Sequence, residues 1–149
     1  MNRQSGMTLV ELIVAIAITG VIVAFLGTAI YQIITVSEYG NGRLTALHEV
    51  QNAAYWLNTD GQGARNATGG SQLVLTLSDN TTVTYALSGT DLRRSAGGLP
   101  LTVARNITSA SFSVSGRMIT INLTSAPVSR DNVSQNGTYM VYLRPQGGS

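Results

Sequence analysis

The chain has 149 residues, enough for one domain with a modest core, and its lack of cysteine excludes disulfides, thiolate metal sites and cysteine nucleophiles. Nine arginines, no lysines and seven acids give a net charge of +2 without a clustered basic face, so the composition gives no evidence for direct nucleic-acid binding. Serine and threonine supply 31 residues, which favours strands, turns and hydroxyl-rich surfaces. We therefore expect a non-enzymatic protein without a cofactor or metal.

A long apolar run dominates the first third of the chain. Residues 12–34 are 23 consecutive uncharged residues, the length at which a helix spans a bilayer core. Arg3 precedes the run, while Glu38 and Arg43 follow it, which predicts a single span with a cytoplasmic N-terminus and the bulk of the chain outside. Glu11 is the anomaly, because a charge at full membrane depth costs about 2.5–3.5 kcal/mol and tends to require a partner.

The sequence SGMTLVEL at residues 5–12, followed by the apolar run, resembles the processing and methylation motif of type IV prepilins and pseudopilins. The resemblance implies that a prepilin peptidase cuts after Gly6, that Met7 becomes the methylated terminus, and that Glu11 pairs with the terminal amine of a neighbouring subunit. Such a pair, about 4 Å apart, attracts by about 4 kcal/mol at an effective dielectric near 20, which offsets much of the burial cost. Met7 replaces the usual phenylalanine, and the proline common later in the helix is absent, with Gly27 in that region.

The helical pattern continues through residues 37–60. One apolar stripe recurs at spacings of three or four residues, and it consists of Leu44, Leu47, Val50, Ala54 and Leu57. The Gly-Asn-Gly sequence at residues 40–42 interrupts the pattern and predicts a kink or break. Gly61 and Gly63 are expected to end the helix.

Beyond residue 72 the pattern alternates with the period of β-strands. Asp79-Asn80 and Ser115-Gly116 mark two hairpin turns, and residues 126–137 are predicted to form a loop. The predicted hairpins and further strands are residues 73–87, 112–123, 99–103 and 139–143. A sheet covering the helix stripe gives an α+β domain, which matches the pilin fold implied by the resemblance.

The predicted organisation is a leader at residues 1–6, a transmembrane and filament-core half-helix at 7–36, an amphipathic half-helix at 37–60, and a β-rich head at 61–149. Residues 48–66 and 83–97 also resemble the helix end and first sheet region of minor pilins and J-type minor pseudopilins, which favours a minor subunit. The resemblance implies four partners: the prepilin peptidase, other pilin or pseudopilin subunits, an inner-membrane assembly platform and the bilayer. Assembly would move the subunit into an extracellular or periplasmic filament.

Other side chains have both functional and ordinary structural interpretations. His48 beside Glu49 offers a general base, but no nucleophile motif accompanies it, and a surface or interface histidine is the commoner case. Arg93 and Arg94 suit contact with anionic lipid or with a neighbouring subunit, or they mark a solvated strand end. Aromatic residues 55 and 56 suit an interface or, more often, the core at a helix end.

Acids and asparagines raise two further possibilities. Asp79, Asp91 and Asp131 could contribute to a calcium site, although each lies beside turn residues. Six of the ten asparagines open an Asn-x-Ser/Thr triplet, which predicts N-glycan acceptors if the export route supplies the transferase. They are Asn66, Asn80, Asn106, Asn122, Asn132 and Asn136. Asparagine at turns and threonine in strands generate the same triplets without any glycan.

The leading interpretation is a structural filament subunit in a minor position, and the major pilin of a shaft is an alternative. The alternative is a membrane-anchored extracellular binding module or adhesin, in which the helix is a plain anchor and residues 1–6 are retained. An exported enzyme is a third class, and no catalytic constellation supports it.

Overall fold

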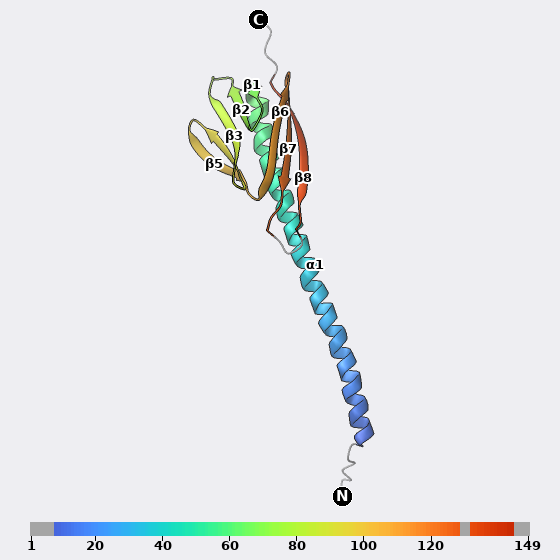
Figure 1. The fold of residues 1–149 in the computed structure, drawn as a ribbon. Helices are drawn as coiled ribbons and strands as arrows, with labels where there is room; N and C mark the ends of the chain where they lie inside the picture. The colour runs from blue at the N-terminus through green and yellow to red at the C-terminus, as the bar shows by residue number, and fades with distance from the viewer. Residues whose placement is uncertain (1–7, 129–131, 145–149) are drawn as a thin grey trace. The chain divides into compact units, whose positions relative to one another are not determined.

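The computed structural model describes residues 8–128 and 132–144. Within these ranges one α-helix precedes eight β-strands arranged in two antiparallel sheets (Figure 1). The elements are α1 (Leu9–Gly63), β1 (Ala64–Thr68), β2 (Gln72–Leu77), β3 (Thr82–Ser88), β4 (Asp91–Ala96), β5 (Leu99–Ala104), β6 (Ile107–Ser115), β7 (Met118–Ser125) and β8 (Gln135–Tyr142). The α+β class predicted from the sequence is confirmed. The chain forms two compact units, which divide between Glu38 and Tyr39.

The described part of the first unit is the apolar portion of α1. Its large aliphatic side chains are exposed along the whole length, from Leu9 to Val36. Thr19, Thr28 and Thr35 each donate their hydroxyl to the carbonyl four residues earlier, at 2.7, 2.9 and 3.0 Å. A lipid environment requires such internal satisfaction, because hydrocarbon offers no hydrogen bonds. Among the described residues, α1 is the one helix that is long and apolar enough to cross a membrane.

The second unit begins at Tyr39 with the remainder of α1, and from here on we call this whole unit the head. The helix is continuous through residues 40–42, so the predicted break is wrong, since Gly-Asn-Gly lowers helix propensity without preventing helical hydrogen bonding. Two members of the predicted stripe, Val50 and Leu57, are fully buried.

The rest of the predicted stripe requires correction. Leu44 is 55% exposed, and Leu47 and Ala54 are only partly buried. The buried line runs instead through Ala46, Val50, Ala53, Leu57, Asp60 and Gly61. These spacings of three and four residues track one helix face, and small alanines and a glycine allow the strands to approach closely. The prediction relied on hydrophobicity, so it selected the larger leucines as buried residues and passed over the smaller residues that the sheets cover.

The five-stranded sheet, sheet A, has the order β1-β2-β3-β4-β5. The predicted first hairpin is confirmed as β2 and β3, with Leu73 opposite Tyr85 and Leu75 opposite Val83. Asn80 has a φ of 65° in its turn, a conformation that asparagine tolerates better than most residues. The weaker candidate at residues 99–103 is confirmed as β5. Strands β1 and β4 were not predicted as strands, because their polar sequences lack a clear apolar alternation.

The three-stranded sheet, sheet B, has the order β6-β7-β8. The predicted second hairpin is confirmed as β6 and β7, with Gly116 in the turn at a φ of 59°. The last strand starts at Gln135, earlier than predicted, so residues 135–137 belong to β8 and not to a loop. Backbone pairing with β7 extends the strand over polar residues that carry no strand pattern. The sequence predicted one sheet, whereas the head has two.

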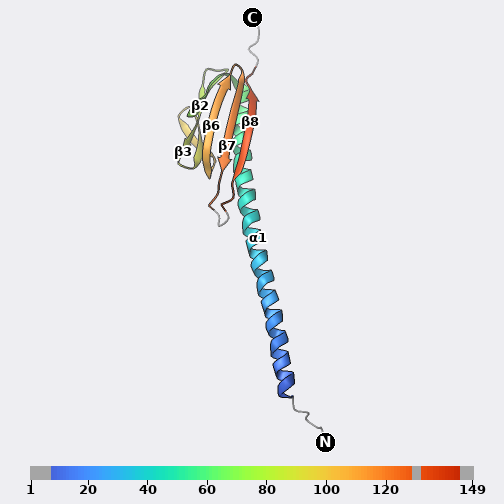
Figure 2. The same ribbon diagram turned by 45° about the vertical axis from the view of Figure 1, so that its right-hand side comes forward.

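One hydrophobic core lies where both sheets meet the C-terminal part of α1 (Figure 2). Glycines permit close packing of the helix on β8: a Cβ at Gly61 would lie 2.6 Å from Val141 Cγ1, and a Cβ at Gly137 would lie 2.5 Å from Val50 Cγ1. The sheets are also linked to each other, because the Gly70 amide donates to the Phe112 carbonyl oxygen at 2.9 Å. The head is therefore a single packed body of helix and two sheets.

Replacing Gly69 with alanine should destabilise this junction. The new Cβ would lie 2.7 Å from the Phe112 carbonyl oxygen, a backbone atom that cannot rotate away, so we expect a loss of about 1–3 kcal/mol in unfolding free energy. Gly40→Ala is the matched control, because that Cβ meets open space within α1. The control should be neutral or up to about 1 kcal/mol stabilising. Equal denaturation midpoints for both variants would contradict the proposed contact.

Candidate functional site

Glu11 and Thr8 form a capping box at the start of α1. The Thr8 backbone amide and hydroxyl donate to Glu11 Oε2 at 3.0 and 3.1 Å, and the Glu11 amide donates to Thr8 Oγ1 at 3.3 Å. Because α1 begins at Leu9, Thr8 is the N-cap and Glu11 the third helical residue. This reciprocal arrangement satisfies two of the amides that every helix N-terminus leaves unpaired.

The capping box gives Glu11 a local role that the sequence analysis missed. The signal was present as Thr-x-x-Glu directly before an apolar helix, the standard pattern for such a cap. A single subunit therefore has internal partners for this carboxylate and does not need a second chain to satisfy it. Gly6 and Met7 lie outside the described residues, so their roles stay predictions.

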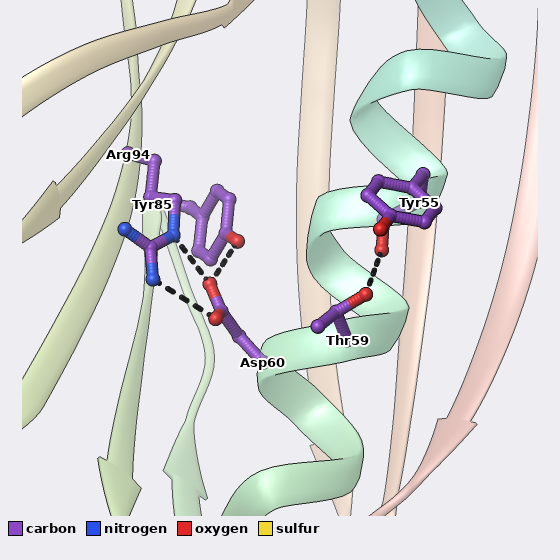
Figure 3. Close-up of polar contacts among 5 residues, drawn as sticks. All are labelled: Tyr55, Thr59, Asp60, Tyr85 and Arg94. Carbon is purple, nitrogen blue, oxygen red and sulfur yellow. Dashed lines mark hydrogen bonds and ion pairs between the residues drawn. The ribbon is translucent and has the colours of Figure 1, made fainter.

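A second polar cluster lies in the head, where the end of α1 meets sheet A (Figure 3). Asp60 is buried, and its Oδ2 accepts hydrogen bonds from the Tyr85 hydroxyl and from Arg94 Nε, the latter at 2.6 Å. Arg94 Nη2 donates to the other carboxylate oxygen, Oδ1, at 3.0 Å. Tyr85 and Arg94 are direct cross-strand neighbours on β3 and β4. The pair is bidentate, so it fixes the orientation as well as the position of Asp60.

Arg94 also stacks on Trp56, with its guanidinium carbon 5.2 Å from the ring centroid. The prediction of a solvated strand end is therefore wrong for Arg94, although its neighbour Arg93 is exposed. The aromatic pair divides in the same way: Trp56 packs partly buried against the core, whereas Tyr55 is 65% exposed. Adjacent helix positions point about 100° apart, so one of the two faces the sheet.

Burial and then the hydrogen bond to Asp60 raise the pKa of Tyr85 above its ordinary value, and the same carboxylate raises the pKa of Arg94. A carboxylate acceptor favours the protonated form of both donors. The cluster thus consists of the Asp60–Arg94 ion pair and the Tyr85 hydroxyl, which keeps its proton at neutral pH. Its chemistry is that of a structural clamp, because every one of these three side chains is bonded to another member of the cluster.

The head should lose stability as pH rises above about 10. Tyrosine in the unfolded chain ionises near its ordinary pKa of 10.0, while Tyr85 in the fold keeps its proton. The unfolded state therefore binds fewer protons, and its free energy falls relative to that of the fold as pH rises. The expected slope is about 1.4 kcal/mol per pH unit for this residue. Unfolding followed through Trp56, the sole tryptophan, should show a shallower slope in Tyr85→Phe. Burial also raises the pKa of Tyr139. Its contribution to the pH dependence of stability is the same in the wild type and in Tyr85→Phe, so it does not affect the comparison.

His48 is exposed and its neighbour Glu49 serves a structural bond. The Arg105 backbone amide donates to Glu49 Oε2 at 2.6 Å, and one turn along the helix Asn52 Nδ2 donates to the Val103 carbonyl oxygen at 2.7 Å. Both bonds hold α1 to the end of β5 and the turn that follows. An open cavity of about 420 Å³ beside them is lined by His48, Glu49, Gln51 and Asn52. These residues include no paired nucleophile and base.

Of the three aspartates named as calcium candidates, the structure describes Asp79 and Asp91. Asp79 accepts from the Thr81 amide and hydroxyl at 3.0 and 2.6 Å, and these bonds lower its pKa. Asp91 opens β4, and Asp131 lies outside the described residues. Over residues 8–128 and 132–144, His, Asp and Glu side chains do not gather in groups of three or more.

Five of the six Asn-x-Ser/Thr triplets have an evident structural role. Three asparagines occupy turn positions with positive φ, namely Asn80, Asn106 and Asn132. Two others form cross-strand Asn/Thr pairs on sheet B, in which Asn122 lies opposite Thr138 and Asn136 opposite Thr124. Asn66 is exposed in β1. Glycan attachment stays a prediction, and the intact mass of native filaments tests it, since a mass equal to that of the bare mature chain would exclude it.

Comparison with known protein families gives a match at the N-terminus of the chain. Residues 1–27 match the family described as the prokaryotic N-terminal methylation motif. No curated protein and no solved structure matches the chain. A motif of this type implies processing by a prepilin peptidase and assembly with other pilin subunits, and the apolar N-terminal helix fits a membrane-anchored, single-pass protein. The motif, together with a long helix packed on antiparallel sheets, supports the resemblance to type IV pilins and pseudopilins.

Proposed function

We propose that this protein is a structural subunit, in a minor position, of a type IV pilus or secretion pseudopilus. The observation that carries the proposal is the methylation motif at residues 1–27, which runs directly into a helix with an apolar exterior and internally bonded threonine hydroxyls. Such a helix is compatible both with lipid before assembly and with a dry protein core afterwards. The subunit would be cut after Gly6 and enter a filament through this helix.

The proposed pathway places the residues in a sequence of environments. Before cleavage, residues 7–36 hold the chain in the membrane with the leader in the cytoplasm and the head outside. After cleavage, the amine of Met7 is methylated, and the assembly platform transfers the subunit from lipid to the filament. There Glu11 exchanges contacts within its own capping box for the terminal amine of a neighbour, while apolar helix surfaces bury one another.

Processing is tested by replacing Gly6 with leucine, which should block cleavage because the peptidase site accepts a residue without a side chain. Intact-mass analysis should find residues 1–6 removed from the wild-type protein and retained in the variant. Gly20→Leu is the control, since it adds the same side chain within the span, where a Cβ meets open space, and should leave cleavage unchanged. Retention of the leader on wild-type protein from assembled filaments would overturn the proposal and favour a plain membrane anchor.

The position in the filament is tested separately by a label on the head. Labelling at the filament end is expected for a minor subunit, whereas continuous decoration would identify a major pilin. Thr59 offers a site for an introduced cysteine because it is exposed and the natural chain contains no cysteine. Its hydroxyl donates to the Tyr55 carbonyl of the same helix at 2.8 Å (Figure 3).

A further inference from the structure

The outward face of sheet B has an unusual composition. In β7 the side chains of Ile119, Ile121 and Leu123 are buried, so the alternate residues point away from the core. Cross-strand register extends this face over all three strands. We call it the outer face of sheet B, and its twelve positions are Ser109, Ser111, Ser113, Ser115, Met118, Thr120, Asn122, Thr124, Asn136, Thr138, Met140 and Tyr142.

None of these twelve described positions carries a charge. They comprise seven serine or threonine hydroxyls, two amides, two methionines and one tyrosine. Solvent-facing strands and edges ordinarily carry charged residues, which limit association. The outward positions of sheet A follow that rule, with Asp91 and Arg93 among them. In sheet B even the edge strand β8, Gln135–Tyr142, is free of charge and of proline.

The middle of this face is a hydrogen-bonded row across the sheet. Ser111 lies opposite Asn122, which lies opposite Thr138. The Thr138 hydroxyl donates to Asn122 Oδ1 at 2.8 Å, and Asn122 Nδ2 lies 3.4 Å from Ser111 Oγ as a weak donor. These contacts orient the amide, while all three residues stay exposed. The remaining amide hydrogen and the hydroxyl lone pairs are available to a ligand in a fixed arrangement.

One end of the same face is apolar and aromatic. Tyr142 lies opposite Met118, and Met140 lies opposite Thr120. Tyr142 is 66% exposed and Met140 is 61% exposed, so this end presents a ring and a thioether to solvent. The outer face of sheet B therefore combines oriented hydroxyl and amide groups with a neighbouring aromatic side chain.

We propose that the outer face of sheet B binds a neutral polysaccharide. Phosphate, nucleic acid and anionic lipid require cations that this face lacks, whereas sugar hydroxyls pair with amides and hydroxyls without any charge. The faces of sugar rings also present C–H groups that pack on an aromatic side chain. The row at Ser111, Asn122 and Thr138 supplies the polar contacts, and Tyr142 supplies the apolar one. This activity is separate from filament assembly and does not depend on it.

The test is retention of the full-length protein, in mild detergent, on microcrystalline cellulose and on chitin. Thr120→Asp places a carboxylate at the centre of the face and should lower the retained fraction at least about tenfold, since a ligand would bury an unpaired charge. Thr84→Asp is the matched control, because Thr84 is a similarly half-buried outward threonine on β3, the central strand of sheet A. Tyr142→Ala should weaken retention without changing the fold.

Each result bears directly on the proposal. Retention of wild type and Thr84→Asp, with loss in Thr120→Asp at an unchanged melting temperature, supports it. Failure of the wild type to bind either polysaccharide overturns it, as does equal retention of the two aspartate variants. A change in oligomeric state for Thr120→Asp, without polysaccharide binding, would also overturn it and identify the face as a contact between copies of this chain.

Discussion

Replacing Arg94 with methionine is expected to cost the head about 3–5 kcal/mol of unfolding free energy. The substitution removes the cation from Asp60 and leaves a buried carboxylate with the Tyr85 hydroxyl as its remaining partner. Removing one member of a buried ion pair is far more costly than the pair is stabilising, because the other charge stays out of water. Denaturant titration of the purified protein, followed by circular dichroism and Trp56 fluorescence, measures the change.

The chain supplies a matched control at the preceding residue. Arg93 lies on the same strand with its side chain exposed, so Arg93→Met should change stability by no more than about 0.5 kcal/mol. Adding Asp60→Asn to Arg94→Met should recover more than half of the loss, since the neutral amide keeps an acceptor for Tyr85 and removes the buried charge. Equal effects of the two methionine substitutions would show that the Asp60 pair does not hold the helix end to sheet A.

Replacing Glu11 should reduce filament yield through its charge and not through its cap. Glu11→Gln keeps a side chain that suits the third position of a capping box but removes the carboxylate that would pair with a neighbour's amine. We expect at least about a tenfold loss of filaments. The attraction between the carboxylate and the amine is about 4 kcal/mol, and a loss of only a third of it already lowers an equilibrium constant about tenfold. Processing should stay normal, and quantification of sheared filaments against cell-associated subunit gives the yield.

Thr8→Ala separates the two roles of Glu11. It removes the reciprocal hydroxyl contact of the cap and should cost the helix end only about 1 kcal/mol, while leaving the charge in place. Filament yield should therefore stay close to that of the wild type. If Thr8→Ala abolished filaments while Glu11→Gln did not, the capping box would be the requirement and intersubunit pairing would be refuted.

The two polar sites differ in how far they could be predicted. Glu11 was found from its place in an apolar run and its spacing from Gly6, both of which are properties of the linear chain. Asp60 and Arg94 are 34 residues apart, and neither has a local pattern that distinguishes it from an ordinary surface residue. Their pairing depends on the register of β3 and β4 and on the end of α1, which are long-range features. The alternating pattern of β3 predicts that Tyr85 is buried, but it does not predict which residue accepts the hydrogen bond of its hydroxyl.

By itself the sequence determined the long apolar run, the change from helical to strand period, both hairpins and the methylation motif at residues 1–27. These features rest on local hydrophobic periodicity and turn residues, which act over a few positions. Only the tertiary structure decided which helix residues are buried, that the strands form two sheets, and that Arg94 turns inward while Arg93 faces water. Such choices depend on which surfaces meet, and small residues such as Ala46, Ala53 and Gly61 matter there because they permit close approach and not because they are hydrophobic.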